Sequence, residues 1–357
     1  MTQAISTDVL IVGLGPAGAS AARAAASAGC RVIGVDRKRR AGIPVQCAEF
    51  VPSMLSPTIE AVNRAQCQRI GSMLTFVENA PPDRKDNFPG VMVDRARFDQ
   101  ELVAAAVDAG AECRFGATVT TIDPDGTVHL STGQQIKAAV LIGADGPRSR
   151  IGDAIHSKNR ELVVARQLTV ALTDPHSATD IFLSTDYRGG YGWLFPRGNV
   201  ANLGIGVVPA ALEALTPLLD ALHRSMVTAG RVGSEILNRT GGAIPVGGMI
   251  KPHGKLGEVM VLLSGDAAGL TNPITGAGIS SAVMSGVIAG DSAQSWIEGN
   301  LAAATDYAEE LAELFGGALA RAVRRRQTLL SRYQSGPGPT QLDLRSAWIA
   351  YPEYWAA

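Results

Sequence analysis

Three glycines near the N-terminus, Gly13, Gly15 and Gly18, have the spacing G-x-G-x-x-G and could bind a phosphate group. The first allows a tight turn, the second lets backbone N–H groups approach a pyrophosphate, and the third lets a helix pack closely on a strand. Pro16 and Ala17 open the alanine-rich segment that we expect to be this helix. Its unpaired N-terminal amides and its dipole would face the phosphates, so the pattern predicts a dinucleotide site.

Asp36 extends this pattern because it follows the apolar run 31–35, about 20 residues after the glycines. A carboxylate at this distance accepts hydrogen bonds from an adenosine ribose and argues against a 2′-phosphate on it. Arg37 comes next and is assigned to the same candidate site. A glycine-rich turn in an ordinary α/β unit is the alternative interpretation.

Two later segments repeat the arrangement of an apolar run that ends in small residues and a carboxylate. Residues 140–142 lead into a segment that contains Asp145, and residues 259–263 lead to Gly265 and Asp266. Open α/β sheets bind ligands at these carboxyl ends of their strands, although Asp266 could also be a turn or helix cap. A further helix start follows, at Gly276, Ala277, Gly278 and Ile279.

Composition excludes several classes of protein. A net charge of −1 and a pI of about 6.5 argue against nucleic acid as a partner. The four cysteines have neither metal-type spacing nor a disulfide-dense pattern, so we expect no metal and a reduced, cytoplasmic setting. No apolar stretch reaches the roughly 18 residues that span a bilayer, but peripheral contact with a membrane stays open.

The hydrophobic pattern changes along the chain from helix-alternating to strand-rich. Residues 54–72 are predicted to be helical, whereas residues 160–250 alternate apolar and polar residues as a half-exposed antiparallel sheet does, interrupted by a helical segment at 210–229. Nucleotide-type signals return at 259, so this sheet is an insertion. Residues 301–333 are amphipathic, and the aromatic residues after them are expected to dock on the protein's own surface.

The three glycine and carboxylate segments, in this order, resemble the glutathione-reductase-type FAD fold in the branch of para-hydroxybenzoate hydroxylase. The resemblance covers the chain up to about residue 295. It implies that Asp36 holds the adenosine ribose, that Val119 offers its backbone to the adenine, and that Asp266 binds the ribityl chain. It also places the amides around Gly278 at the flavin, where a helix N-terminus would offset the negative charge of the reduced ring.

Within this branch, two further motifs resemble the geranylgeranyl reductase family. They are C-A-E at residues 47–49, beside the flavin, and Y-G-W-L-F-P at residues 191–196, which matches a Y-x-W-x-F-P pattern. The resemblance also places Arg95 near the cofactor. The chain departs from the family at Ala48, where glycine is usual, and in a C-terminal region that is shorter than in many members.

The motif at residues 191–196 indicates the shape and polarity of the substrate. Alternation along a strand puts Tyr191, Trp193 and Phe195 on one face. Such a wall suits an apolar, elongated molecule, and the tyrosine and tryptophan keep polar edges for orientation. An aromatic core stripe is the competing interpretation.

We therefore expect an α/β fold in which a discontinuous Rossmann-like FAD-binding domain carries an inserted antiparallel-sheet substrate domain and a C-terminal helical tail. The FAD-binding domain is assigned to residues 1–72, 94–158 and 255–300. The substrate domain is assigned to residues 73–93 and 159–254, and the helical region to residues 301–357.

The leading hypothesis is an FAD-dependent oxidoreductase that reduces C=C bonds of an isoprenoid or similar hydrophobic substrate, with Cys47, Tyr191 and Trp193 at the reaction face. Because there is no second G-x-G-x-x-G, the electrons are expected from NAD(P)H that binds transiently, or from another carrier. The alternative is a flavin-dependent monooxygenase or halogenase-like enzyme that acts on an aromatic group, in a small molecule or in a peptide or protein. The third hypothesis is a flavin-binding protein without catalytic activity, which senses redox state or carries a prenyl lipid.

Overall fold

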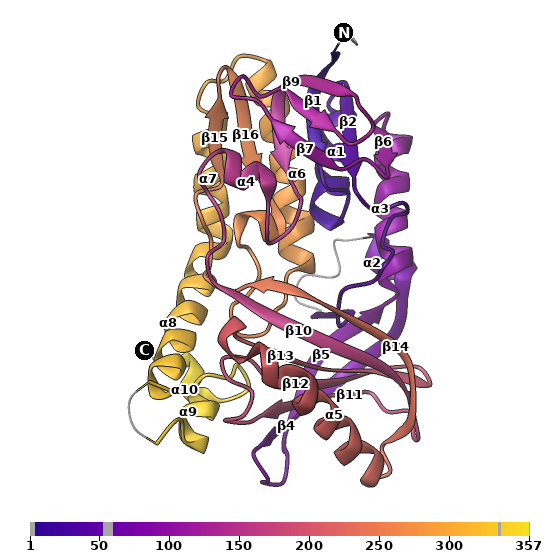
Figure 1. Cartoon of the computed structure of the whole chain (residues 1–357), viewed down its shortest axis with the longest axis vertical. Coiled ribbons are helices and arrows are strands. Elements are labelled where there is room, and N and C mark those ends of the chain that lie inside the picture. The colour runs from indigo at the N-terminus through magenta and orange to yellow at the C-terminus, as the bar shows by residue number, and fades with distance from the viewer. Residues whose placement is uncertain (1–3, 53–59, 335–336, 357) are drawn as a thin grey trace.

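The computed structural model describes residues 4–52, 60–334 and 337–356. Within these residues the chain forms two eight-stranded β-sheets, which occupy the upper and lower halves of the molecule in Figure 1. Helices pack on both sheets, and a helical C-terminal region runs along one side. The α/β fold class expected from the sequence is confirmed.

The first sheet is mainly parallel and has the order β15-β16-β9-β1-β2-β6, with the hairpin β7–β8 joined to β9. Val12 at the end of β1 pairs with Gly143 of β9, which also pairs with Leu263 of β16, so these three strands end at one edge. The strands are β1 Ile5–Val12, β2 Val32–Asp36, β6 Glu112–Phe115, β7 Val119–Ile122, β8 Val128–Leu130, β9 Gln135–Gly143, β15 His253–Leu256 and β16 Val259–Leu263.

The second sheet has the order β14-β10-β13-β12-β11-β4-β5-β3. It is antiparallel except where β4 runs parallel to β11, because it combines two separate parts of the chain. Its strands are β3 Phe50–Pro52, β4 Gln66–Val77, β5 Asp83–Val93, β10 Leu162–Leu172, β11 Ala178–Leu183, β12 Gly192–Arg197, β13 Val200–Val207 and β14 Val232–Pro245.

Helices cover the sheets and link them. A π-helical turn, Ala312–Gly316, joins α7 to α8, and this rod extends from the first sheet to the second (Figure 1). The α-helices are α1 Pro16–Ser27, α2 Glu60–Ala65, α3 Arg95–Asp108, α4 Arg150–Ala154, α5 Leu212–Thr228, α6 Ile279–Ile297, α7 Ala303–Leu311, α8 Gly317–Arg332, α9 Gln341–Ser346 and α10 Pro352–Trp355.

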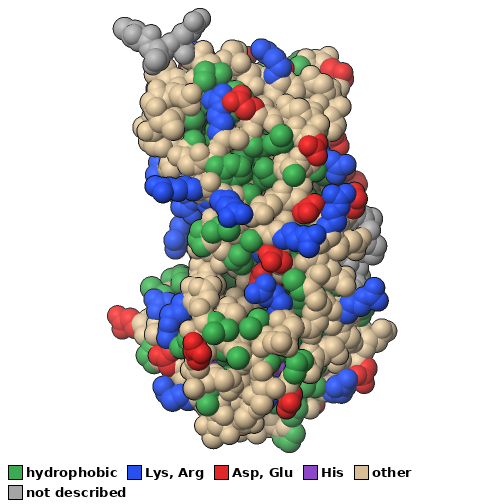
Figure 2. Space-filling model, turned by 90° about the vertical axis from the view of Figure 1, so that its right-hand side faces the viewer, with side chains coloured by type: hydrophobic (Ala, Val, Ile, Leu, Met, Phe, Trp, Pro, Cys, Tyr) green, Lys and Arg blue, Asp and Glu red, His purple; other side chains and the backbone are tan. Residues whose placement is uncertain are grey.

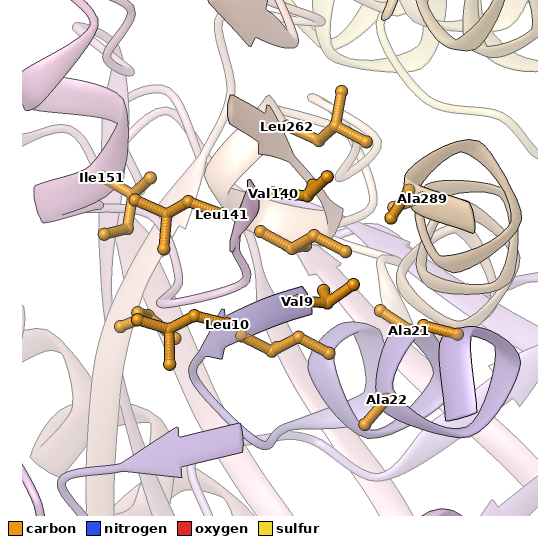
Figure 3. Packing of buried hydrophobic residues seen from close by; sticks show 14 of the residues in the cluster. Val9, Leu10, Ala21, Ala22, Val140, Leu141, Ile151, Leu262 and Ala289 are labelled. Carbon is orange, nitrogen blue, oxygen red and sulfur yellow. The ribbon is translucent and has the colours of Figure 1, made fainter. Parts of the chain in front are cut away.

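The core of the first sheet depends on small residues in α1 and α6. Figure 3 shows Val9 and Val140 directed toward Ala21 of α1 and Ala289 of α6, which are all fully buried. The two helices approach so closely that a Cβ atom on Gly286 would lie 2.2 Å from the carbonyl oxygen of Ala17. This close packing fixes the starts of both helices relative to the strand ends.

The helix predicted for residues 54–72 is wrong in its second part. Residues 54–59 lie outside the described residues and Glu60–Ala65 is helical, but β4 starts at Gln66. Exposed residues alternate with less exposed ones from Cys67 to Gly71, which is the period of a strand at a sheet surface. Tertiary pairing with β5 therefore overrides the local helical pattern.

The aromatic C-terminal residues dock on the protein's own surface, as expected, with one exception. Trp348, Tyr351 and Tyr354 are buried, whereas Trp355 remains 55% exposed. No helix in the described ranges has the length and apolar character that crossing a membrane requires. The face turned to the viewer in Figure 2 carries basic and acidic side chains with apolar ones between them, in keeping with the small net charge.

Candidate active site

The three segments that the sequence analysis singled out meet at one edge of the first sheet. Each follows a parallel strand, and the backbone joins them: the N–H of Ala144 donates to Val12 O at 2.8 Å, and that of Ser264 donates to Gly143 O at 2.9 Å. Residues from positions 13, 144 and 265 onward are thereby brought together. This edge is where open α/β sheets bind ligands.

The glycine loop separates positions that must be small from one that faces open space. A Cβ on Gly13, whose φ is +94°, would lie 2.3 Å from Ala144 O, and a Cβ on Gly18 would lie 1.7 Å from Gly13 O. Around Gly15, by contrast, nothing lies within 4 Å of a Cβ. Gly15 is also the residue before α1, which Pro16 and Ala17 begin, and no side chain caps this helix. Gly13 and Gly18 therefore shape the loop, and Gly15 leaves room for a ligand.

Asp36 lies at the end of β2 and holds the glycine loop. Its carboxylate accepts the N–H of Leu14 at 2.8 Å and that of Lys38 at 2.7 Å, while Arg37 between them is exposed. The carbonyl oxygen of Asp36 accepts the N–H of Ala117, so Val119 at the start of β7 lies two residues from this contact. The predicted ribose and adenine positions thus lie next to each other.

Asp145 has a local structural role that its position after β9 did not reveal. Its carboxylate accepts hydrogen bonds from the Ser149 hydroxyl and from the N–H of Arg150 at 2.7 Å, at the start of α4. Burial raises the pKa of Asp145, and these hydrogen bonds act in the opposite direction. Both oxygens already have partners within the chain.

Asp266 lies against the N-terminus of α6. Its carboxylate accepts the Thr271 hydroxyl at 2.6 Å, and a Cβ on Gly278 would lie 2.8 Å from that hydroxyl and 3.3 Å from the carboxylate. Burial raises the pKa of Asp266, against the effects of Thr271 and of the positive charge of Arg95. The helix begins at Ile279 after the loop of Gly276 and Ala277, with no side-chain cap and no acidic residue in its first turn.

These features fit a dinucleotide such as FAD. Two helices, α1 and α6, direct uncapped N-termini to the same edge of the sheet, and neither has an acidic residue in its first turn. Such helix ends attract phosphate and other negative charge. The open space at Gly15 and the carboxylates of Asp36 and Asp266 add room for a pyrophosphate and acceptors for hydroxyl groups.

The loop 47–49 is held by the second sheet and by the start of α3. The buried Glu49, with φ +69°, accepts the N–H of Arg95 at 3.1 Å and the Asn202 amide at 2.8 Å, and Arg197 lies 3.4 Å away as an ion pair. Gln167 donates to the carbonyl oxygen of Cys47 at 3.1 Å. Glu49 therefore fixes the conformation of the loop, and the side chain of Cys47 remains partly exposed.

Arg95, the first residue of α3, links two parts of the site. Its guanidinium pairs with the buried carboxylate of Asp99 at 3.0 Å and hydrogen-bonds to the side chain of Cys47. Burial alone would lower the pKa of Arg95, but Asp99 and Cys47 outweigh it and raise that pKa. A fixed positive charge thus lies beside Cys47 and close enough to Asp266 to act on its carboxylate.

The aromatic residues lie on one face of the second sheet, as alternation predicted. Ring centroids are 5.7 Å apart for Tyr191 and Trp193, and 6.4 Å apart for Trp193 and Phe195. The hydroxyl of Tyr191 donates to Thr275 O at 2.6 Å, which ties this face to the loop before α6. Burial raises the pKa of Tyr191, and Cys47 adds to the effect.

The structure therefore brings the loop 47–49, Tyr191, Arg95 and the loop before α6 together. Gln167 connects Trp193 to this group, because it accepts the indole N–H at 3.0 Å and donates to Cys47 O. Gln167 was not predicted from the sequence, although an amide among the inward-facing apolar residues of a strand was a signal. Thr271, which donates to Asp266, was not predicted either, nor were Asn202 and Trp348, whose roles depend on contacts distant in sequence.

Comparison with known proteins identifies the family to which the chain belongs. No family model matches the chain. The digeranylgeranylglycerophospholipid reductase of Methanocella arvoryzae is 32% identical over 305 residues, which cover 80% of this chain and 76% of the relative.

Solved structures are similar over most of their length. A geranylgeranyl bacteriochlorophyll reductase-like protein from Thermoplasma acidophilum has a TM-score of 0.80 and 23% identity, and the match covers 99% of this chain and 98% of that one. A probable FAD-dependent monooxygenase from Pseudomonas aeruginosa has a TM-score of 0.68 and 18% identity, with 92% and 98% covered. At these identities the two structures show a shared fold.

The first sheet ends at a glycine loop and at the uncapped starts of α1 and α6, and the sequence is 32% identical to that of a reductase. The chain therefore belongs to the geranylgeranyl reductase family of FAD-dependent oxidoreductases, and it is an enzyme.

Proposed function

We propose that this enzyme reduces C=C bonds of an isoprenoid or similar hydrophobic substrate. The observation that carries the proposal is that the loop 47–49 and the loop before α6 meet at the aromatic face. Ala48 and Ile274 pack in the cluster that contains the aromatic side chains, and Tyr191 donates to Thr275 O. The name of the relative from Methanocella arvoryzae, a digeranylgeranylglycerophospholipid reductase, supports an isoprenoid lipid as the substrate class.

The cofactor would be held along the edge of the first sheet. Gly13, Gly15 and Gly18 with the start of α1 would bind the pyrophosphate, Asp36 the ribose, and Asp266 with the amides of Gly278 the flavin end. When bound and reduced by its electron donor, FAD would supply the hydride. In this division of labour, the first sheet would bind the cofactor and the second sheet the substrate, so that β3 and the start of β4, assigned from the sequence to the FAD-binding domain, would belong to the substrate domain.

The residues of the reaction face would orient the substrate and deliver a proton. Cys47 is the proposed acid: its S–H gives a proton to one carbon of the double bond, and the positive charge of Arg95 offsets the thiolate that is left. Tyr191, which donates to Thr275 O, would lie against the reacting carbons. Trp193, which Gln167 holds in place, would extend the apolar wall. A proton from solvent then restores the thiol.

The electron donor is proposed to be NAD(P)H bound transiently, or another reduced carrier. The four cysteines are free, which supports a cytoplasmic location. Because the relatives' substrate is a lipid, we also propose peripheral contact with a membrane surface. A hydroxylating or halogenating activity on an aromatic group is the second candidate, supported by the fold shared with the Pseudomonas aeruginosa monooxygenase.

The test measures whether the substrate oxidises the reduced FAD. Enzyme with reduced FAD is mixed with geranylgeraniol without oxygen, and the visible absorbance of the oxidised flavin is recorded. We expect it to return at a rate that depends on the concentration of geranylgeraniol. A Cys47→Ala variant that binds FAD serves as the control and should respond slowly. If the absorbance returns only when oxygen is admitted, the reductase proposal is wrong and the second candidate gains.

A further inference from the structure

The C-terminal tail, residues 337–356, covers the aromatic face of the second sheet and brings one aromatic side chain to its edge. The indole of Trp348 is only 3% exposed, and its ring centroid lies 4.8 Å from that of Tyr191 at an angle of 54°. Trp348 packs in the same cluster as Trp193 and Phe195. The tail therefore reaches the part of the aromatic face nearest to the loop before α6.

The indole N–H of Trp348 is buried and has no acceptor among the described residues. The other indoles of the same region are paired: Trp193 donates to Gln167, and Trp355 donates to Ile349 O at 2.9 Å. A buried donor without a partner costs free energy, and an apolar side chain at this position would avoid that cost. Packing of the tail alone does not account for a tryptophan here.

Two buried hydroxyls on the same face also have no partner in the described part of the chain, those of Thr75 and Thr179. Ile181 pairs with Trp193 on one side and with Thr75 on the other, so these three residues form one row across β12, β11 and β4. Thr179 lies two residues from Ile181 and points to the same side. This face thus carries hydrogen-bonding groups that the folded chain leaves unused.

The tail does not depend on Trp348 for its attachment. The carboxylate of Asp83 accepts the Tyr351 hydroxyl at 2.7 Å and pairs with Arg345 at 2.7 Å, and Arg325 donates to Tyr354 O at 3.0 Å. These contacts hold the segments on both sides of Trp348. A smaller side chain at position 348 should therefore leave the tail docked and open space beside Tyr191.

We propose that Trp348 determines substrate size: its indole limits how much of an isoprenoid chain fits beside Tyr191. This inference rests on the proposed function, because it assumes that the chain lies on the aromatic face. A smaller side chain at position 348 would lengthen the apolar surface that the substrate can contact. Each additional CH₂ group that is buried strengthens binding by a factor of about four.

The test uses FAD-loaded, oxidised enzyme and a series of prenyl alcohols, namely geraniol, farnesol and geranylgeraniol. Binding is followed through the flavin absorbance, and the affinity for geranylgeraniol is divided by that for geraniol. Trp348→Ala should raise this ratio at least about tenfold, which is less than the burial of two CH₂ groups would give. Trp355→Ala, in the same tail but exposed, should leave the ratio within about twofold of the wild type.

A Trp348→Leu variant guards against a folding defect, since it keeps an apolar side chain and should raise the ratio by less. FAD content and tail attachment are checked by absorbance and by limited proteolysis. An unchanged ratio in either variant, with FAD retained, overturns the assignment of Trp348 while leaving the reductase proposal intact. If the wild type neither binds nor reduces any of the three alcohols, the proposed function itself fails, and the size limit with it.

Discussion

Replacing Gly15 by alanine should separate folding from cofactor binding. At this position φ is −75° and ψ is −168°, which any L-residue adopts, and a Cβ would have no atom of the protein within 4 Å. The added methyl group lies instead in the space where backbone amides would meet the pyrophosphate. The substitution should therefore spare the apoprotein and weaken FAD binding.

The two effects have opposite signs. Loss of chain entropy in the unfolded state should stabilise the apoprotein by about 0.4–1 kcal/mol. Displacing a phosphate from one charged hydrogen bond costs about 1.5–3 kcal/mol, so FAD should bind roughly 10- to 150-fold more weakly. Gly18→Ala is the matched comparison, because its Cβ would lie 1.7 Å from Gly13 O and the backbone would have to move.

The assay combines urea unfolding of the apoproteins with titration of FAD by fluorescence quenching. We expect Gly15→Ala to unfold at the same or higher urea concentration than the wild type and to bind FAD weakly. Gly18→Ala should unfold at a clearly lower urea concentration or fail to fold. A Gly15→Ala protein with wild-type FAD affinity would refute the placement of the pyrophosphate beside Gly15. A destabilised Gly15→Ala apoprotein would refute the claim that the folded chain leaves room for a methyl group there.

Three further outcomes are expected. Cys47→Ala should keep full FAD content but lose most turnover of a prenyl substrate; full activity would remove Cys47 from the reaction. Asp36→Ala should lower both FAD retention and the free energy of unfolding, the latter by about 1–3 kcal/mol, because the amides of Leu14 and Lys38 lose their acceptor. Burial raises the pKa of Asp180 to about 6, against the opposing effect of Arg231, so the folded state holds this proton more tightly than the unfolded state. The free energy of unfolding should therefore fall by up to about 3 kcal/mol between pH 4 and pH 6 and then level off, and urea unfolding of Asp180→Asn should lack this component.

The sequence was informative where local pattern and tertiary structure agree. The strands before Gly13, Asp145 and Gly265 were predictable because continuous apolar runs that end in small residues are typical of buried parallel strands. The common face of Tyr191 and Trp193 followed from the two-residue period of a strand.

Contacts between distant segments were beyond sequence patterns. Gln167 and Asn202 fix the loop 47–49 across more than 100 residues, and no local signal specifies such a partner. The parallel pairing of β4 with β11 and the packing of Trp348 on Tyr191 depend in the same way on how the sheets and the tail assemble. Asp36 was assigned a ligand, but its bonds to Leu14 and Lys38 give it a structural role too.

Reduction of C=C bonds by this enzyme is tested most directly by the mass of the product. Enzyme with FAD, reduced chemically in the absence of oxygen, is incubated with geranylgeraniol, and the extracted lipid is analysed by mass spectrometry. We expect a product that has gained two hydrogens for each double bond reduced, formed with the wild type and nearly absent with Cys47→Ala. Recovery of unchanged geranylgeraniol, together with oxygen-dependent hydroxylation of an aromatic compound by the same preparation, would contradict it.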